Sequence, residues 1–157
     1  FGYKLFGKDW EEAMTDRDLH YLLLVGHQRA NRRIVEQVYA RGLQPGQPKI
    51  LEFLREHQGC TQKEIGRGCV LDKSSVTGLL SRMEEAGLVR REVCPQDRRA
   101  ARIYLTDRGM ELAQWVQGIF DQVDALGWGD IPQEEREQCM ATLRKVIRNF
   151  ENREESE

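Results

Sequence analysis

The sequence predicts a mainly α-helical chain that carries one small β-hairpin. Three observations lead to this fold class. Long stretches toward both ends place apolar residues at helical spacing. A central stretch contains shorter helical patterns separated by glycines and capping residues. One segment, residues 89–106, carries short strand-like runs on either side of turn-forming residues.

The first predicted element is a long helix that ends at about Arg41. Thr15 or Asp16 is a good N-cap, because its side-chain oxygen can accept a hydrogen bond from a free N–H group of the first turn. Gly42 is well placed to end the helix. The apolar stripe consists of Leu19, Leu22, Leu23, Ala30, Ile34 and Val38.

Two shorter helices are predicted next. The first covers about residues 47–57. The second opens at Thr61, where Glu64 three residues later completes a capping box. We expect Gly66 and Gly68 to keep this second helix short and to end it.

A fourth helix is predicted for residues 73–86, with Asp72 as its N-cap and Gly87 as its stop signal. Its apolar positions fall on one face, and they are Val76, Leu79, Leu80 and Met83. The remaining face is small, polar or cationic, so no bulky side chain would hold a broad partner away from it.

The predicted hairpin reads VRREVCPQDRRAARIYLT, with turn chemistry at residues 95–97. Five arginines lie within it: Arg90, Arg91, Arg98, Arg99 and Arg102. A turn does not require positive charge in order to fold, so the arginines indicate that the hairpin has a binding role.

Two long helices complete the chain. Thr106 caps the first, which we expect to run to about Leu126, where the segment GWGD breaks it. Leu112, Val116, Ile119, Val123 and Leu126 step by 4, 3, 4 and 3 residues, as in a coiled-coil seam. This seam favours a dimer interface, with packing inside the chain as the alternative. Pro132 opens the last helix, whose stripe is Cys139, Leu143, Val146, Ile147 and Phe150.

Residues 45–106 therefore follow the order of a winged helix-turn-helix, which places its second helix in the DNA major groove. We expect an arm and dimerisation helix in residues 1–44, the DNA-binding domain in 45–106 and dimerisation helices in 107–157. Residues 61–108 carry 10 basic and 7 acidic side chains, a net charge of +3. The residues expected to contact DNA are Thr61, Gln62, Lys63, Lys73, Ser74, Ser75, Thr77, Arg82, Arg98 and Arg99.

The segment SSVTGLLSRMEEAGLVRREVCPQDRRAARIYLTDRG resembles the recognition helix and wing of the multiple-antibiotic-resistance regulator (MarR) family. The matching motifs lie at residues 83–89, 95–99 and 105–109, and the helix order extends the resemblance over about residues 15–153. The resemblance implies a homodimer on a pseudo-palindromic operator, with Arg98 or Arg99 in the minor groove. It also implies a repressor released by a small, often aromatic, anionic ligand.

Two alternatives to a ligand-released repressor remain open. Cys94 lies near four arginines in sequence and is the candidate for a redox-sensing thiol. A winged-helix interaction module without a DNA role is the other. No cysteine precedes Cys60, which argues against the peroxide-sensing mechanism of the family.

Other classes of function find little support in the sequence. The chain has no Cys-x-x-Cys pair and no histidine cluster, so we expect no zinc site. We find no catalytic constellation and no cofactor motif, and we expect a protein that is not an enzyme. The apolar run at residues 22–25 is far too short to span a bilayer, so we expect no membrane association and a cytoplasmic location.

Overall fold

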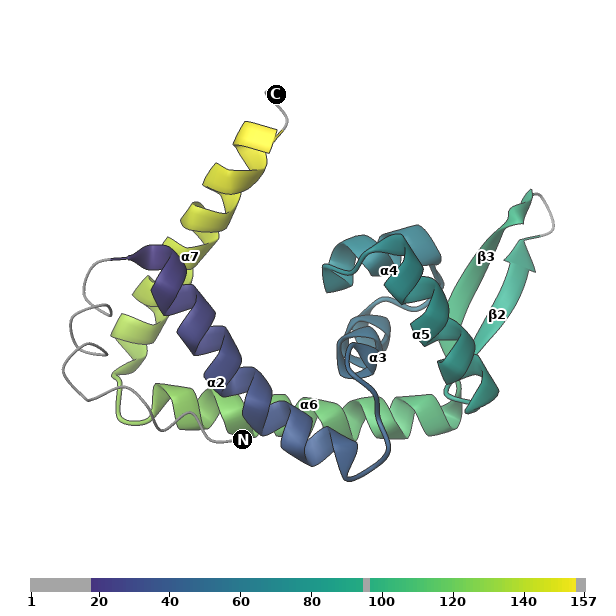
Figure 1. Cartoon of the computed structure of the whole chain (residues 1–157), viewed down its shortest axis with the longest axis horizontal. Helices are drawn as coiled ribbons and strands as arrows, with labels where there is room; N and C mark the ends of the chain where they lie inside the picture. Colours follow the sequence, from purple (N-terminus) through teal and green to yellow (C-terminus); the bar gives the residue numbers. More distant parts are fainter. Residues whose placement is uncertain (1–17, 95–96, 155–157) are drawn as a thin grey trace, which may run out of the picture. The chain divides into compact units, whose positions relative to one another are not determined.

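The computed structural model describes residues 18–94 and 97–154, with side chains for residues 18–93 and 101–152. Its elements are α2 (Leu19–Tyr39), α3 (Gln47–Glu56), β1 (Cys60–Thr61), α4 (Gln62–Cys69), α5 (Lys73–Glu85), β2 (Val89–Cys94), β3 (Asp97–Leu105), α6 (Asp107–Trp128) and α7 (Gln133–Glu154) (Figure 1). This order confirms the predicted helical class with a small β-hairpin. The chain forms two compact units, residues 1–123 and residues 124–157.

The long helix α2 ends as predicted. Gly42 adopts a left-handed conformation with φ of 76°. This conformation lets the Leu43 N–H return to the carbonyl of Val38, which satisfies one of the free carbonyls of the last turn. The helix begins at Leu19 with Asp18 at the N-cap position, and the Asp18 side chain makes no capping hydrogen bond. The expected N-caps, Thr15 and Asp16, lie outside the described residues, and neither occupies the N-cap position of α2.

The core of the first unit is built by α3, α4, α5, α6, the sheet and the end of α2, where Val38 is buried. Its fully buried side chains include Ile50, Leu51, Leu54, Ile65, Val76, Leu80, Met83, Ile103 and Val116. These residues come from segments far apart along the chain, as Ile50 and Val116 show. The periodic stripes of the helices and the strand therefore close around a single apolar cluster.

The glycines of α4 do not end it, contrary to the expectation. Gly66 and Gly68 lie inside the helix, which ends at Val70 with φ of 54° and ψ of 50°. A Cβ on Gly68 would come within 2.1 Å of the Phe53 ring, so glycine here permits close packing of α4 on α3. The left-handed residue is Val70 instead, which is 87% exposed.

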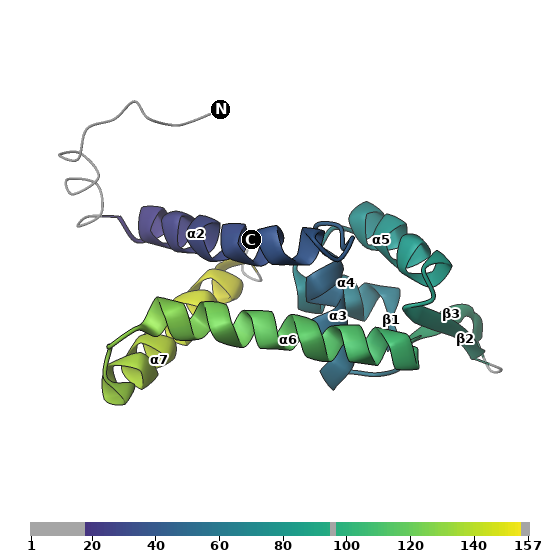
Figure 2. The same cartoon turned by 90° about the horizontal axis from the view of Figure 1, so that it is seen from below.

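The sheet contains one strand that the sequence did not predict. The strand order is β1-β3-β2, and all pairs are antiparallel. In the two-residue strand β1, Cys60 pairs with Ile103 and Thr61 pairs with Arg102. Figure 2 labels the three strands. A two-residue strand is too short to show an alternating pattern in the sequence. The strand forms because it pairs with β3, which is distant in the sequence.

The helix α6 begins at its predicted cap and ends later than predicted. The Thr106 hydroxyl accepts from the Gly109 N–H at 3.0 Å and donates to the Gly87 carbonyl at 2.7 Å. The helix continues to Trp128, so Gly127 lies within it rather than breaking it. A single glycine inside a helix costs only about 1 kcal/mol relative to alanine, which neighbouring turns can offset.

The 4-3-4-3 seam of α6 packs inside the chain over most of its length. Val116, Ile119 and Val123 are buried in the core of the first unit, whereas Leu126 is 57% exposed. The prediction that the seam forms a dimer interface is therefore wrong for these three residues, which are already buried within the chain. The spacing of a seam cannot distinguish a partner helix from the apolar face of the same chain.

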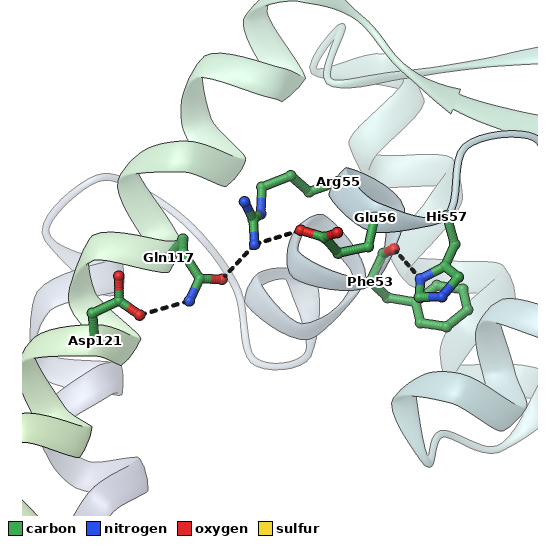
Figure 3. Close-up of polar contacts among 6 residues, drawn as sticks. All are labelled: Phe53, Arg55, Glu56, His57, Gln117 and Asp121. Carbon is green, nitrogen blue, oxygen red and sulfur yellow. Dashed lines mark hydrogen bonds and ion pairs between the residues drawn. The ribbon is translucent and has the colours of Figure 1, made fainter.

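A chain of polar contacts connects α3 to α6 (Figure 3). The Arg55 Nη2 donates to the Gln117 Oε1 at 3.1 Å and lies 2.7 Å from the Glu56 Oε1. The Gln117 Nε2 in turn donates to the Asp121 Oδ1 at 2.8 Å. These contacts fix the register of α6 against the helices of the winged core.

In the second unit, Arg136 holds the turn that precedes α7. Its Nε donates to the Ile131 carbonyl at 2.6 Å, and its Nη2 donates to the Gly129 carbonyl at 3.0 Å. The helix α7 exposes large apolar side chains: Met140, Ile147 and Phe150. Throughout residues 18–94 and 97–154, every helix is too short or too polar to cross a membrane.

Candidate nucleic-acid interface

The helices α4 and α5, with the turn between them, form the predicted helix-turn-helix. The helix α5 buries Val76, Leu79, Leu80 and Met83 and leaves Lys73, Ser74, Ser75, Thr77 and Arg82 at the surface. The hairpin of β2 and β3 lies next to α5 in the same unit (Figure 1). This arrangement brings the polar face of α5 and the base of the hairpin together as one candidate surface.

The N-terminus of α5 is organised around the Asp72 carboxylate. The Ser74 hydroxyl donates to Asp72 Oδ1 at 2.6 Å, and the Ser75 hydroxyl donates to Asp72 Oδ2 at 2.5 Å. The Ser75 N–H also donates to Oδ1 at 2.9 Å, which confirms Asp72 as the N-cap. The bonds from Ser74 and then Ser75 hold the pKa of the Asp72 carboxyl far below its usual range. We call these three residues the Asp72 clasp.

A second polar contact joins the two motif helices. The Thr77 hydroxyl donates to the Lys73 carbonyl at 2.8 Å. Since a hydroxyl has one proton, the Thr77 oxygen can only accept from its other neighbour, the Gln62 Nε2. The sequence predicted both residues as DNA contacts but gave no sign of their pairing, because they lie 15 positions apart on different helices.

Thr61 forms the predicted capping box with Glu64. The Thr61 N–H and hydroxyl donate to the Glu64 carboxylate at 2.7 and 2.8 Å, and the Glu64 N–H donates back to the hydroxyl at 3.3 Å. The bond from the Thr61 N–H, followed by that from its hydroxyl, lowers the pKa of Glu64. A carboxylate therefore occupies the start of α4, where Lys63 is exposed and the half-buried Gln62 turns its amide to Thr77.

Three cationic side chains lie on the two motif helices. Lys63, Lys73 and Arg82 lie at the surface, one on α4 and two on α5. Gly78 lies beneath the last of them, since a Cβ at Gly78 would be 3.7 Å from the guanidinium nitrogens of Arg82. The missing side chain at this position leaves the Arg82 guanidinium room along the helix.

The strand arginines of the hairpin are engaged in the fold. The Arg91 Nε donates to the Glu84 carboxylate at 2.8 Å. Arg90 pairs with Glu92, and its guanidinium lies 4.7 Å from the centroid of the Tyr104 ring. The side chains of Arg98 and Arg99, predicted for the minor groove, lie outside the described residues. So does the thiol of Cys94, and its redox role stays a prediction.

Arg102, the remaining strand arginine, holds β3 to the segment that follows α3. Its Nη1 donates to the Gly59 carbonyl at 2.7 Å. The Gly59 N–H donates to the Ile103 carbonyl at 2.9 Å, so the two segments exchange hydrogen bonds at this point. The arginine supports the base of the hairpin.

The described residues offer no alternative chemical centre. Burial raises the pKa of the Cys69 thiol to about 11 and also raises that of Cys60, so both favour the neutral thiol. His20 and His27 lie exposed on α2. Within the part of the chain that the structure describes, no three His, Cys, Asp or Glu residues lie together as metal ligands.

Comparison with known proteins agrees with this geometry. Residues 41–100 match the model of the MarR family. The chain is 32% identical over 98 residues to the transcriptional regulator HosA of Escherichia coli O111:H-, a match that covers 62% of this chain and 73% of HosA. The chain belongs to the MarR family. It is thus a transcriptional regulator by family, and MarR regulators are not enzymes.

Two further MarR-type relatives match along most of the chain. The transcriptional repressor NicR of Pseudomonas putida is 28% identical over 132 residues, which cover 84% of each chain. The S. aureus MepR–DNA complex is 26% identical with a TM-score of 0.78, and the match covers 85% of this chain and 99% of MepR. The match to MepR thus extends beyond residues 41–100, the part that the family model covers.

Proposed function

We propose that this MarR regulator is a homodimeric, sequence-specific DNA-binding repressor that a small, aromatic anionic ligand releases from its operator. The observation that carries the proposal is the polar and cationic face of α5 beside the hairpin. The relative MepR was solved in complex with DNA, and the relative NicR is named a repressor. Both therefore support DNA binding and repression. A DNA-binding repressor of this kind acts in the cytoplasm.

The DNA contacts fall into three classes under this proposal. The N-terminal part of α5, with Ser74 and Ser75, reads base edges in the major groove. Lys63 and Lys73 neutralise phosphates and fix the register of the helix without reading sequence. Arg82 contacts phosphate or guanine, and Arg98 or Arg99 enters the minor groove. The winged region, residues 45–106, is the functional DNA-binding part, with residues 1–44 and 107–157 serving dimerisation.

Exposed apolar side chains on the outer helices support the homodimer. On α2, Leu19, Leu22, Leu23 and Leu24 are 46, 49, 42 and 50% exposed. Full burial of a leucine side chain stabilises a protein by roughly 1.5–3 kcal/mol relative to full exposure, and a half-exposed leucine gains only part of this free energy. These leucines contribute the dimer contacts of the first unit, and the exposed apolar residues of α7 contribute those of the second. The operator of a homodimer is pseudo-palindromic, with half-sites about 34 Å apart.

The test is selection of bound duplexes from a random pool, followed by affinity measurements at several salt concentrations. We expect an enriched pseudo-palindrome and an affinity that falls steeply with salt, because bound phosphates release counterions. Aromatic carboxylic acids are then screened for release of the selected duplex. A pool without enrichment would instead favour an interaction module without a DNA role, and duplex release by none of the acids would contradict the ligand class.

A further inference from the structure

The Asp72 clasp determines which hydrogen-bonding groups of DNA the start of α5 can read. We infer that Ser74 and Ser75 act only as hydrogen-bond acceptors, and so recognise the exocyclic amino groups of adenine or cytosine rather than phosphates or guanine. This inference rests on the proposed function, since it specifies how the same surface selects a sequence.

Asp72 engages the hydroxyl protons of both Ser74 and Ser75. Each serine hydroxyl has a single proton and two lone pairs. An ionised carboxylate offers only acceptors, so both hydroxyl protons point at Asp72, at 2.6 and 2.5 Å. These charge-assisted bonds are stronger than neutral ones, and a neutral base edge would not displace them easily. The two serine oxygens therefore offer only lone pairs to a bound DNA, and they can only accept hydrogen bonds from it.

The chemistry of the major groove then selects the partner. The donors that bases present there are the adenine N6 and cytosine N4 amino groups, whereas guanine presents the acceptors O6 and N7. Phosphate oxygens are acceptors as well, so the serine oxygens cannot bond to them while the clasp is closed. An amino group that donates to a serine extends a chain that ends on the Asp72 charge, and such chains strengthen each bond in them.

The neighbouring Gln62–Thr77 contact extends the same pattern to α4. The Thr77 proton is used on the Lys73 carbonyl, and one of its lone pairs accepts from the Gln62 Nε2. The Gln62 amide keeps its Oε1 and its second N–H, the pair of groups that matches adenine N6 and N7. The exposed cations Lys63, Lys73 and Arg82 supply donors on the two motif helices, and the clasp supplies acceptors.

The experiment uses the full chain and the duplex it selects. Single bases of each half-site are replaced by analogues that lack one group: purine for adenine and 2-pyrimidinone for cytosine remove the amino donor, and 7-deazapurines remove the N7 acceptor. We expect loss of one amino group beneath α5 to weaken binding by about five- to tenfold, the effect of one hydrogen bond. In that same base pair, 7-deaza substitution of the purine should change affinity by less than about twofold, because no group of the clasp donates to N7.

Three variants test whether the clasp is responsible for the loss of affinity when an amino group is removed. In Ser74→Ala/Ser75→Ala, duplexes with and without the amino group should bind equally. Asp72→Asn keeps an equally good N-cap, so the helix should persist, but its amide nitrogen cannot accept from a hydroxyl and frees one serine to donate. Its discrimination between the two duplexes should fall severalfold. Ser81→Ala, on the same helix outside the clasp, should retain full discrimination.

Two results would overturn the inference while leaving the proposed function intact. One is a selected duplex whose binding depends on N7 beneath α5 but not on any amino group, with that dependence abolished in Ser74→Ala/Ser75→Ala. The other is wild-type binding that responds to neither kind of analogue. A random pool that yields no bound duplex would instead contradict the proposed function itself.

Discussion

Gly109 lies so close to the backbone of Leu88 that a Cβ on it would be 2.0 Å from the Leu88 carbonyl oxygen. The first turn of α6 thus rests directly on the start of β2, and the same carbonyl accepts from the Thr106 N–H at 3.0 Å. We expect Gly109→Ala to lower the free energy of unfolding by about 1–3 kcal/mol, because overpacked backbone must shift. Gly118→Ala, also in α6 but with nothing within 4 Å of its Cβ, should be neutral or stabilising by up to about 1 kcal/mol. Chemical unfolding compares the two, and equal effects would contradict the close approach.

Val70 adopts a left-handed backbone conformation in the turn between α4 and α5, and this conformation is strained for a residue with a Cβ. Its φ is 54°, and its side chain is 87% exposed, so its removal sacrifices almost no packing. A left-handed conformation costs a residue with a Cβ about 1–2 kcal/mol. We expect Val70→Gly to raise the unfolding free energy by up to about 1 kcal/mol, whereas Val70→Ala keeps the left-handed cost and should gain less. A Val70→Gly variant less stable than wild type would show that the side chain contributes packing.

The acid stability of the protein should depend on Asp72. Hydrogen bonds from Ser74 and Ser75 depress the pKa of this carboxyl in the folded chain, and an unfolded aspartate titrates near about 3.9. A depressed folded pKa contributes stability that is complete above the unfolded value and disappears as the pH falls below it. Thermal unfolding between about pH 5 and pH 2 should therefore decline less steeply in Asp72→Asn than in wild type. Ser74→Ala/Ser75→Ala should also flatten the decline, and unchanged profiles in both would contradict the geometry of the clasp.

The wing arginines should act through phosphate and minor-groove charge. We expect Arg98→Ala/Arg99→Ala to weaken binding to all duplexes and to reduce the salt slope by about 0.9 for each phosphate that is no longer neutralised. Arg91→Ala, which removes a partner of Glu84 at the hairpin base, serves as a matched removal of positive charge. Its slope should change less than that of the double variant. An unaltered slope in the double variant would show that the wing assignment is wrong.

The exposed leucines of α2 should matter for association and not for folding of the winged core. We expect Leu22→Glu/Leu23→Glu to shift the chain from dimer to monomer, because these half-exposed side chains would meet a partner in the apolar interface. Sedimentation velocity measures the change. Val93→Glu, at another exposed apolar side chain on β2, should leave the dimer unchanged. A double variant that sediments as a dimer would place the interface elsewhere.

Much of the fold could be predicted because helix signals are local. The Thr61–Glu64 capping box, the Asp72 cap and the stop at Gly42 all form as expected. Each depends on groups within about four residues of one another, so the pattern contains all that is needed. The apolar face of α5 was equally clear, since helical spacing defines it.

Local patterns in the sequence thus predicted the order of the helices and the hairpin, most of their ends and the polar face of the winged core. Tertiary packing creates β1, brings Gly68 against Phe53 and turns the seam of α6 inward. It also decided where the hydroxyl protons of Ser74, Ser75 and Thr77 point. A sequence pattern shows which hydrogen bonds a residue can make and whether its side chain can be buried. It does not identify the residue's partner, because the surfaces that supply partners come together only when distant segments pack.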